Sequence, residues 1–221
     1  MLIETINQTI SDIENYKKSK EQLLNATKFN ENIAKLSVAT EKLDKTISII
    51  DEIKAYNICS NSLVTEEIKQ SILSAIDDCG SKVADYSLTK DSVAYFQEKV
   101  NNLVQNIDYQ WKIYSGIYAS GIVEYLGIVD NLVDDPQKAR QLKQTIKMQT
   151  TDAPKSKDEV AIFAQAVHDA KAIVDLLQVD DQIRNFLIKV SSKTATILDL
   201  NQSVLDWITK HKLQSRIKVT F

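Results

Sequence analysis

Residues 89–114, TKDSVAYFQEKVNNLVQNIDYQWKIY, show the clearest periodicity in the chain. Apolar side chains recur there at Val93, Phe96, Val100, Leu103, Ile107, Trp111 and Tyr114. Steps of three and four residues place all of them on one face of an α-helix. The same spacing continues to Leu132, so the sequence predicts one long helix that follows an N-cap at Thr89.

A second periodic segment occupies the N-terminal quarter of the chain. Steps of three and four residues, which form the seam of a coiled coil, separate Ile3, Ile6, Ile10 and Ile13. Lysines hold the next two seam positions, and an out-of-phase seam then runs over residues 29–50. Such a shift is either a stutter in one helix or a turn between two. Because residues 25–30 contain no Gly or Pro, we favour one helix to about Ala55, with a helical hairpin as the alternative.

The composition is poor in residues that interrupt helices. The 221 residues include 4 Gly and 2 Pro, and 43 % of them are hydrophobic. So few turn-forming residues favour long helices and disfavour a β-sandwich, a Rossmann fold or a barrel. We therefore predict an all-α fold, an elongated helical bundle with coiled-coil-like long helices over residues 1–133. We expect residues 134–221 to form a smaller helical cap that ends in a short strand.

Polar residues mark the predicted helix boundaries. Residues 57–65 are a loop by composition, and Thr65 precedes two acidic residues, as the N-cap of a helix does. Further helix starts are predicted at Asp135 before Pro136, at Ser156 in a capping box with Glu159, at the Asp180-Asp181 pair and at Asn201. The C-terminal region is thereby divided into several shorter helices, which are stable only when they pack together.

The last seven residues, SRIKVTF, differ from the rest of the chain. Apolar and polar side chains alternate from Ser215 to Phe221, which is the pattern of a half-buried strand. One interpretation is that this tail folds back on the C-terminal helices, where it buries apolar side chains or forms a short ladder with residues 195–198. A second is that it adds a strand to the sheet edge of a partner, and a third is that it is disordered. The predicted partner-binding residues are Trp207, Arg216, Ile217, Lys218, Val219 and Phe221.

Aromatic residues and glycines are concentrated in residues 109–127, YQWKIYSGIYASGIVEYLG. We expect a packing crossover in which Gly116, Gly121 and Gly127 let a neighbouring helix approach closely while the aromatic rings fill the space beside it. The alternative is a platform on which an aromatic ligand or a nucleic-acid base stacks.

No catalytic constellation is visible in the sequence. It contains no phosphate loop, dinucleotide fingerprint, nucleophile elbow or zincin motif. His168 and Asp169 are adjacent, but neighbouring helical residues point about 100° apart, which is wrong for an acid/base dyad. Cys59 and Cys79 are too far apart for a metal knuckle and are interpreted as buried thiols. The sequence therefore predicts no catalytic, cofactor-binding or metal-binding residue.

The charge and hydropathy predict a cytoplasmic location. With 27 basic and 30 acidic residues, the net charge is -3, so no overall field attracts the chain to nucleic acid or to an anionic membrane. Glu4 interrupts the region where a signal peptide has its apolar core. The most apolar run, residues 113–133, contains Glu124 and Asp130, which a membrane span disfavours.

Three C-terminal segments carry a resemblance to a known family. Thr196-Ile-Leu-Asp-Leu200, Val204-Leu-Asp-Trp207-Ile and Arg216-Ile-Lys-Val-Thr-Phe221 resemble, in their apolar spacing, the C-terminal region of large bacterial P-loop ATPases of phage-exclusion defence clusters. The resemblance is confined to these last residues, and the nucleotide-binding motifs of that family are absent here. It implies a helical C-terminal region of a larger protein, or a companion to one, in antiviral defence.

The sequence thus favours a non-catalytic interaction or scaffolding module that acts in a multi-protein assembly. We expect a homo-oligomer or a stable complex with another protein, because long apolar seams pair with a second helix. One alternative is a nucleic-acid-binding accessory protein, with lysines and arginines gathered on one face. Another is a helical membrane-active protein that inserts residues 113–133.

Overall fold

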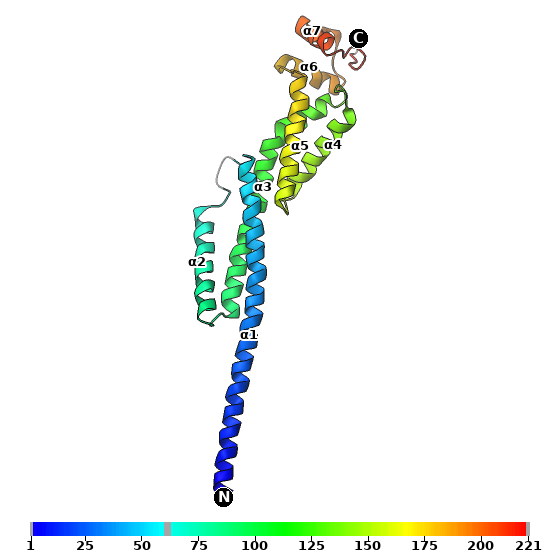
Figure 1. Cartoon of the computed structure of the whole chain (residues 1–221). Helices are drawn as coiled ribbons and strands as arrows, with labels where there is room; N and C mark the ends of the chain where they lie inside the picture. The colour runs from blue at the N-terminus through cyan, green and yellow to red at the C-terminus, as the bar shows by residue number, and fades with distance from the viewer. Residues whose placement is uncertain (1, 60–62, 220–221) are drawn as a thin grey trace. The chain divides into compact units, whose positions relative to one another are not determined.

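The computed structural model describes residues 2–59 and 63–219, and the side chains from residue 11 onward within these ranges. This part of the chain is all-α (Figure 1). Its elements are α1 (Leu2–Ala55), α2 (Glu66–Ala84), α3 (Lys90–Val129), α4 (Pro136–Thr151), α5 (Lys157–Leu176), α6 (Asp181–Ser191), the short 3-10 helix η1 (Ile197–Asp199) and α7 (Gln202–Lys210).

Helix α1 settles the choice between one helix and a hairpin. It runs without interruption for 54 residues, and the shift between the two predicted seams lies inside it. At that shift the hydroxyl of Thr27 donates to the carbonyl oxygen of Leu23 at 3.0 Å, a contact made within one helical turn. The prediction of a single helix to Ala55 is confirmed.

The predicted N-caps are confirmed. They could be predicted from the sequence because a cap depends only on neighbouring residues. Side-chain oxygens accept backbone N–H groups three residues ahead at Thr65, Thr89, Asp135, Ser156, Asp180 and Asn201. The capping box at Ser156 differs in one bond. The carboxylate of Glu159 accepts the backbone N–H of Lys155 at 2.6 Å, one residue before the expected donor.

Several helix ends turn through a left-handed residue. The φ angle is positive at Asn57, Tyr86, Gln178, Lys193 and Lys212, none of which is glycine. At the end of α7, Leu213 donates its N–H to the carbonyl of Ile208 at 2.9 Å, and Lys212 donates to Thr209 at 3.2 Å. These two bonds make a Schellman motif with Lys212 in the position that glycine usually holds.

The described residues divide into two compact units. The first contains residues up to Ile47 and residues 64–106, and therefore α2 and parts of α1 and α3. Its core is formed by Ala39, Leu43, Ile72, Ala75, Cys79, Val93, Phe96, Val100 and Leu103. The amide of Asn32 donates to the carbonyl oxygen of Leu88 at 3.0 Å and links α1 to the connection between α2 and α3.

The second unit contains residues 48–63 and 107–221, and therefore the ends of α1 and α3 with α4 to α7. Its largest fully buried side chains include Ile53, Leu63, Trp111, Leu126, Ile146, Phe163, Leu187 and Leu213. Trp111 meets Phe163 edge-on at 5.0 Å between ring centroids, and its indole N–H donates to the carbonyl of Gln149 at 2.8 Å. The aromatic stretch of α3 thus packs on α4 and α5.

The predicted terminal strand is wrong for residues 215–219. The backbone N–H groups of Arg216 and Ile217 both donate to the carbonyl oxygen of Leu213, at 2.9 and 3.2 Å, and so close a turn. These donors are no longer available to a ladder. Thr220 and Phe221 lie outside the described residues. The alternation of apolar and polar residues corresponds to burial in a turn and the segment after it: Ile217 and Val219 are half-buried, and Arg216 and Lys218 are exposed.

Within the described ranges, none of the helices combines the length and the hydropathy that crossing a membrane requires.

Candidate interaction surface

The N-terminal part of α1 has no cover from the described part of its unit. Every residue from Ser11 to Lys28 is exposed. Cover begins at Phe29, whose ring lies 5.4 Å from that of Tyr86, and the first buried side chain is Asn32. Figure 1 shows this part of α1 extending past α2 of the same unit. The uncovered helix is 18 residues long, which is about 27 Å at 1.5 Å per residue.

Large apolar side chains lie on this uncovered helix. The exposed fraction is 49 % for Ile13, 69 % for Tyr16, 70 % for Leu23 and 52 % for Leu24. Residues 13, 16, 20, 23 and 27 follow steps of three and four and share one face. We name the side chains of Ile13, Tyr16, Lys20, Leu23 and Thr27 the α1 stripe. Most helical stability in proteins comes from packing an amphipathic face, so the stripe is a surface that gains stability from a cover.

Two of the sequence-predicted partner residues make contacts inside the second unit. Trp207 is only 4 % exposed, and its indole N–H donates to the carbonyl oxygen of Leu177 at 2.6 Å. Arg216 donates from Nη1 to the carbonyl oxygens of Leu132 and Val133, at 2.7 and 2.9 Å. These side chains attach α7 and the tail to the ends of α5 and α3.

Three of the predicted partner residues, Arg216, Lys218 and Val219, line a hollow of about 340 Å³. Its lining residues are Val190, Lys193, Ala195, Arg216, Lys218 and Val219. Lys218 is exposed, Ile217 and Val219 are half-buried, and Phe221 lies outside the described residues. The structure therefore brings Arg216, Lys218 and Val219 together, while Trp207 is not part of this hollow.

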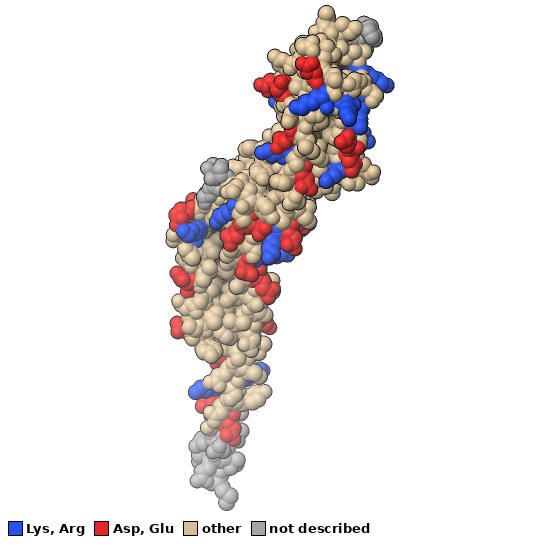
Figure 2. Space-filling view, turned by 45° about the horizontal axis from the view of Figure 1, so that its top comes forward, with Lys and Arg blue, Asp and Glu red and all other residues tan. Residues whose placement is uncertain are grey.

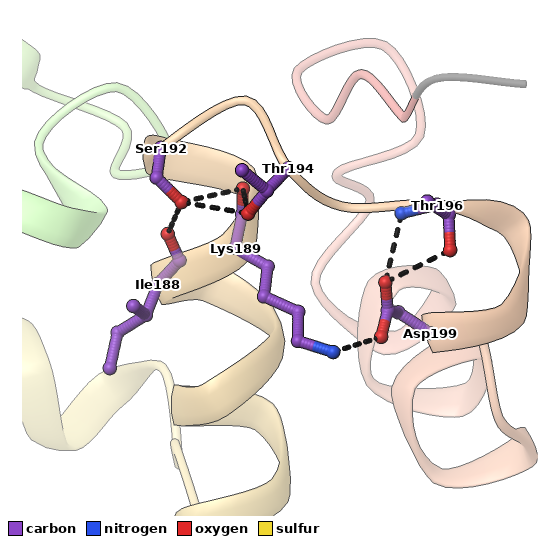
Figure 3. A network of polar contacts seen from close by, with 6 residues as sticks. All are labelled: Ile188, Lys189, Ser192, Thr194, Thr196 and Asp199. Atoms are coloured by element: carbon purple, nitrogen blue, oxygen red, sulfur yellow. Dashed lines mark hydrogen bonds and ion pairs between the residues drawn. The ribbon is translucent and has the colours of Figure 1, made fainter.

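A polar network holds the loop beside this hollow (Figure 3). Asp199 accepts from the ammonium of Lys189 and, at 2.9 Å, from the backbone N–H of Thr196. These bonds, that to Lys189 first, hold the pKa of the Asp199 carboxyl below its usual value. At the end of α6, Ser192 and Thr194 are joined through their hydroxyls at 3.0 Å. The ammonium of Lys189 is thus paired with a carboxylate of its own unit.

The glycines of α3 do not serve the close approach that the sequence predicted. A Cβ placed on Gly116 or Gly121 would meet no atom within 4 Å, so that prediction is wrong at both positions. At Gly127 the nearest atom is the flexible end of Lys143, at 2.9 Å from the added carbon. The helix face that packs on α5 is the one with Trp111 and Tyr118, whose rings contact Phe163.

Gly121 instead lies beside an open hollow of about 540 Å³. Its lining residues are Tyr118, Gly121, Ile122, Tyr125, Lys171, Val174, Asp175, Gln178, Val179 and Asp180. The guanidinium of Arg184 stacks on the ring of Tyr125 at 4.6 Å and pairs with Glu124 at 3.1 Å. One face of that tyrosine is therefore already covered, which weakens the interpretation of this stretch as a stacking platform.

Among the described residues, burial shifts the pKa values of His211 and Cys79. His168 is exposed and lies 3.6 Å from Asp169. Burial, and then the charge of Lys210, lowers the pKa of His211, whose Nε2 is buried without a hydrogen-bond partner. Burial raises the pKa of the Cys79 thiol, which lies 3.6 Å from the carbonyl of Ser92. In the part of the chain that the structure describes, His, Cys, Asp and Glu form no group of three that could hold a metal.

Comparison with protein-family models, with curated proteins and with solved structures finds no match for this chain. Its function is therefore inferred from the geometry of its surfaces. The sequence predicted the partner site at the C-terminus. It also showed the apolar seam in α1, but the seam alone did not indicate which residues of α1 are exposed in the folded chain.

Proposed function

We propose that this protein is a non-catalytic helical interaction module of a multi-protein assembly, and that the α1 stripe is its main contact surface. The observation that carries the proposal is the exposure of every residue from Ser11 to Lys28 on a helix that presents Ile13, Tyr16 and Leu23 on one face. A helix with such a face is typical of segments that pack against another helix.

Covering the apolar side chains of this surface would favour association. Covering an exposed Ile or Leu side chain contributes about 1 to 2 kcal/mol, because each is roughly half to two-thirds exposed and full burial gives about 1.5 to 3 kcal/mol. The three apolar members of the stripe and the neighbouring Leu24 together offer several such contributions. Part of this sum offsets the loss of translational and side-chain freedom on binding.

The setting that we propose is the bacterial cytoplasm, in antiviral defence. It rests on the C-terminal resemblance to the P-loop ATPases of phage-exclusion clusters. In such a setting the second unit would dock beside, or form part of, a larger protein, while α1 makes the contact that builds the assembly.

A nucleic-acid-binding role has less support. On the face shown in Figure 2, Lys and Arg side chains alternate with Asp and Glu side chains over the described surface. In the basic C-terminal segment, Arg216 is held by backbone carbonyls, and Lys189 nearby is held by Asp199. Binding to phosphates requires cations gathered on one face and directed to solvent.

Photo-crosslinking in the source cell tests the proposed function. A photoreactive amino acid replaces Tyr16 or Leu23 in the stripe, and in matched controls it replaces Asn15 or Gln22, which are exposed on the opposite face of the helix. We expect one defined protein adduct from both stripe positions and none from the controls, with mass spectrometry identifying the adduct. Equal labelling from the two faces, or no adduct from the stripe, would overturn the proposal.

A further inference from the structure

We infer that the α1 stripe pairs with the same stripe of a second copy, as a parallel two-stranded coiled coil. The inference rests on the proposed function, because it names the partner of the same surface. Three observations lead to it: the order of residues in the stripe, the two charged residues that flank it, and the point at which the cover of α1 begins.

The heptad frame follows from the described residues. With Ile13, Lys20 and Thr27 at the first core position, called a, the second core position, d, holds Tyr16 and Leu23. The other frame that contains Ile13 has core residues 13, 17, 20, 24 and 27 and would place two lysines in consecutive layers. Because a buried lysine layer is costly, the frame with a single lysine is favoured.

The residue types in this frame favour two strands. Ile13 is a β-branched apolar residue at a, and Leu23 is at d, as in two-stranded parallel coils, while Tyr16 and Thr27 hold the other d and a positions. A charged residue at a, here Lys20, specifies the register and the number of strands at a cost in stability. In a narrow two-stranded coil the long stem of this lysine lies along the apolar layer while its ammonium reaches water.

The charged residues beside the stripe favour the parallel orientation. Asp12 holds position g and Lys17 holds position e of the next heptad, and both are exposed. In a parallel pair, g of one helix faces e of the next heptad in its partner, so Asp12 of each copy faces Lys17 of the other. In an antiparallel pair, g faces g and e faces e, so Asp12 would not face Lys17 and these two ion pairs would not form.

The geometry of α1 leaves room for this coil. The uncovered helix ends at Lys28, directly before Phe29 packs against Tyr86, and Thr27 is the last residue of the stripe. Residues 11–28 span about two and a half heptads, and the coil is limited to them because the seam of Ile3, Ile6, Ile10 and Ile13 follows the other frame. A coil of this length with one lysine layer forms a pair of moderate affinity, which suits an assembly that is regulated by concentration.

Disulfide trapping tests both the partner and the orientation. In the whole chain, Tyr16→Cys or Leu23→Cys is compared with Gln22→Cys on the opposite face, and light scattering coupled to size exclusion gives the mass. The native cysteines are buried, and the unmodified protein gives the background. We expect a dimer in solution, and mild oxidation should join the copies at Tyr16→Cys and at Leu23→Cys but not at Gln22→Cys.

Other outcomes separate the two proposals. A dimer that Tyr16→Cys and Leu23→Cys fail to join would overturn the parallel pairing. A monomer at all accessible concentrations would overturn self-pairing, and an adduct with a different protein in the photo-crosslinking experiment would then leave the proposed function standing. A dimer whose Gln22→Cys variant is joined as efficiently as the stripe variants would overturn both.

A charge exchange gives an independent check. Asp12→Lys should weaken the dimer by about fivefold at low salt, since two exposed ion pairs of a few tenths of a kcal/mol become repulsions. Lys17→Asp should weaken it similarly, and the double exchange should restore the original affinity within about twofold. If the double variant is as weak as the single ones, Asp12 and Lys17 do not face each other and the parallel register is wrong.

Discussion

Arg216 donates from its guanidinium to the carbonyl oxygen of Leu132 at 2.7 Å, across 84 positions of sequence. The same nitrogen reaches the carbonyl of Val133 at 2.9 Å, and the second nitrogen of the fork lies 3.6 Å from Asp134. A charged donor thus satisfies carbonyl groups just beyond the end of α3. The tail of the chain fixes the connection between α3 and α4.

Arg216→Ala should therefore destabilise the second unit by about 1 to 2 kcal/mol, because two charge-assisted bonds to carbonyl groups are lost. Urea unfolding followed by tryptophan fluorescence measures the change. Lys218→Ala is the matched control, since Lys218 is exposed and nearby, and it should change stability by less than about 0.5 kcal/mol. Equal effects of the two substitutions would show that the Arg216 bonds are not formed.

Trp207→Phe tests the bond that attaches α7 to the end of α5. The substitution keeps an apolar ring in the buried site but leaves the carbonyl of Leu177 without its donor, at an expected cost of about 1 to 3 kcal/mol. Thermal unfolding followed by circular dichroism gives the comparison. Tyr109→Phe removes a polar group from an exposed ring and should leave the melting temperature almost unchanged.

Gly116→Ala should stabilise α3 by up to about 1 kcal/mol, because alanine favours the helix and its Cβ meets no atom within 4 Å. Gly127→Ala should give a smaller gain, since its Cβ would require Lys143 to move. Chemical denaturation of the two variants gives both values. A loss of stability with Gly116→Ala would contradict the open space beside this glycine.

The stability of the second unit should fall as the pH decreases from about 7.5 to 5. Because burial lowers the pKa of His211 in the folded state, the unfolded chain binds a proton more readily, and stability is lost as the pH falls through the ordinary histidine pKa of 6.5 toward the lower folded value. His211→Gln should reduce this dependence. His168→Gln, at an exposed position, should retain it, and the same slope in both variants would contradict the role of His211.

Lys20→Leu should tighten self-association by at least tenfold, because the change replaces the polar layer of the α1 stripe with an apolar one. The substitution should also make the oligomeric state less specific, so that light scattering detects species larger than a dimer. Lys18→Leu is the matched control, since Lys18 is exposed on the outer side of the same helix. If Lys20→Leu leaves both mass and affinity unchanged, Lys20 does not lie in the contact.

The sequence predicted the features of the fold that depend on neighbouring residues. Caps such as Thr65 and Ser156 were found because each is satisfied within its own first turn. The single helix α1 was found because its composition offers no turn at residues 25–30. The periodic residues of α3 from Val93 to Trp111 were assigned to the core because the helical period identifies the buried face, whereas Tyr114 is only half-buried.

The features that depend on distant partners were missed. The alternation in residues 215–219 resembles a strand, yet the turn there is closed by the carbonyl of Leu213 and held by the bonds of Arg216 to the end of α3. The sequence also could not show that Gly116 and Gly121 of α3 face away from its neighbours. Both features depend on packing between residues far apart in the sequence, which the local pattern does not record.

The positions of glycine and of left-handed residues in this chain are the reverse of the usual arrangement. Gly80, Gly116, Gly121 and Gly127 lie inside helices, while residues with side chains, among them Tyr86, Lys193 and Lys212, hold the left-handed positions after helix ends. Each left-handed residue with a Cβ costs roughly 1 kcal/mol, and each glycine inside a helix costs a similar amount. The fold therefore permits a higher melting temperature than this sequence gives it, and Gly116→Ala together with Lys212→Gly would raise that temperature.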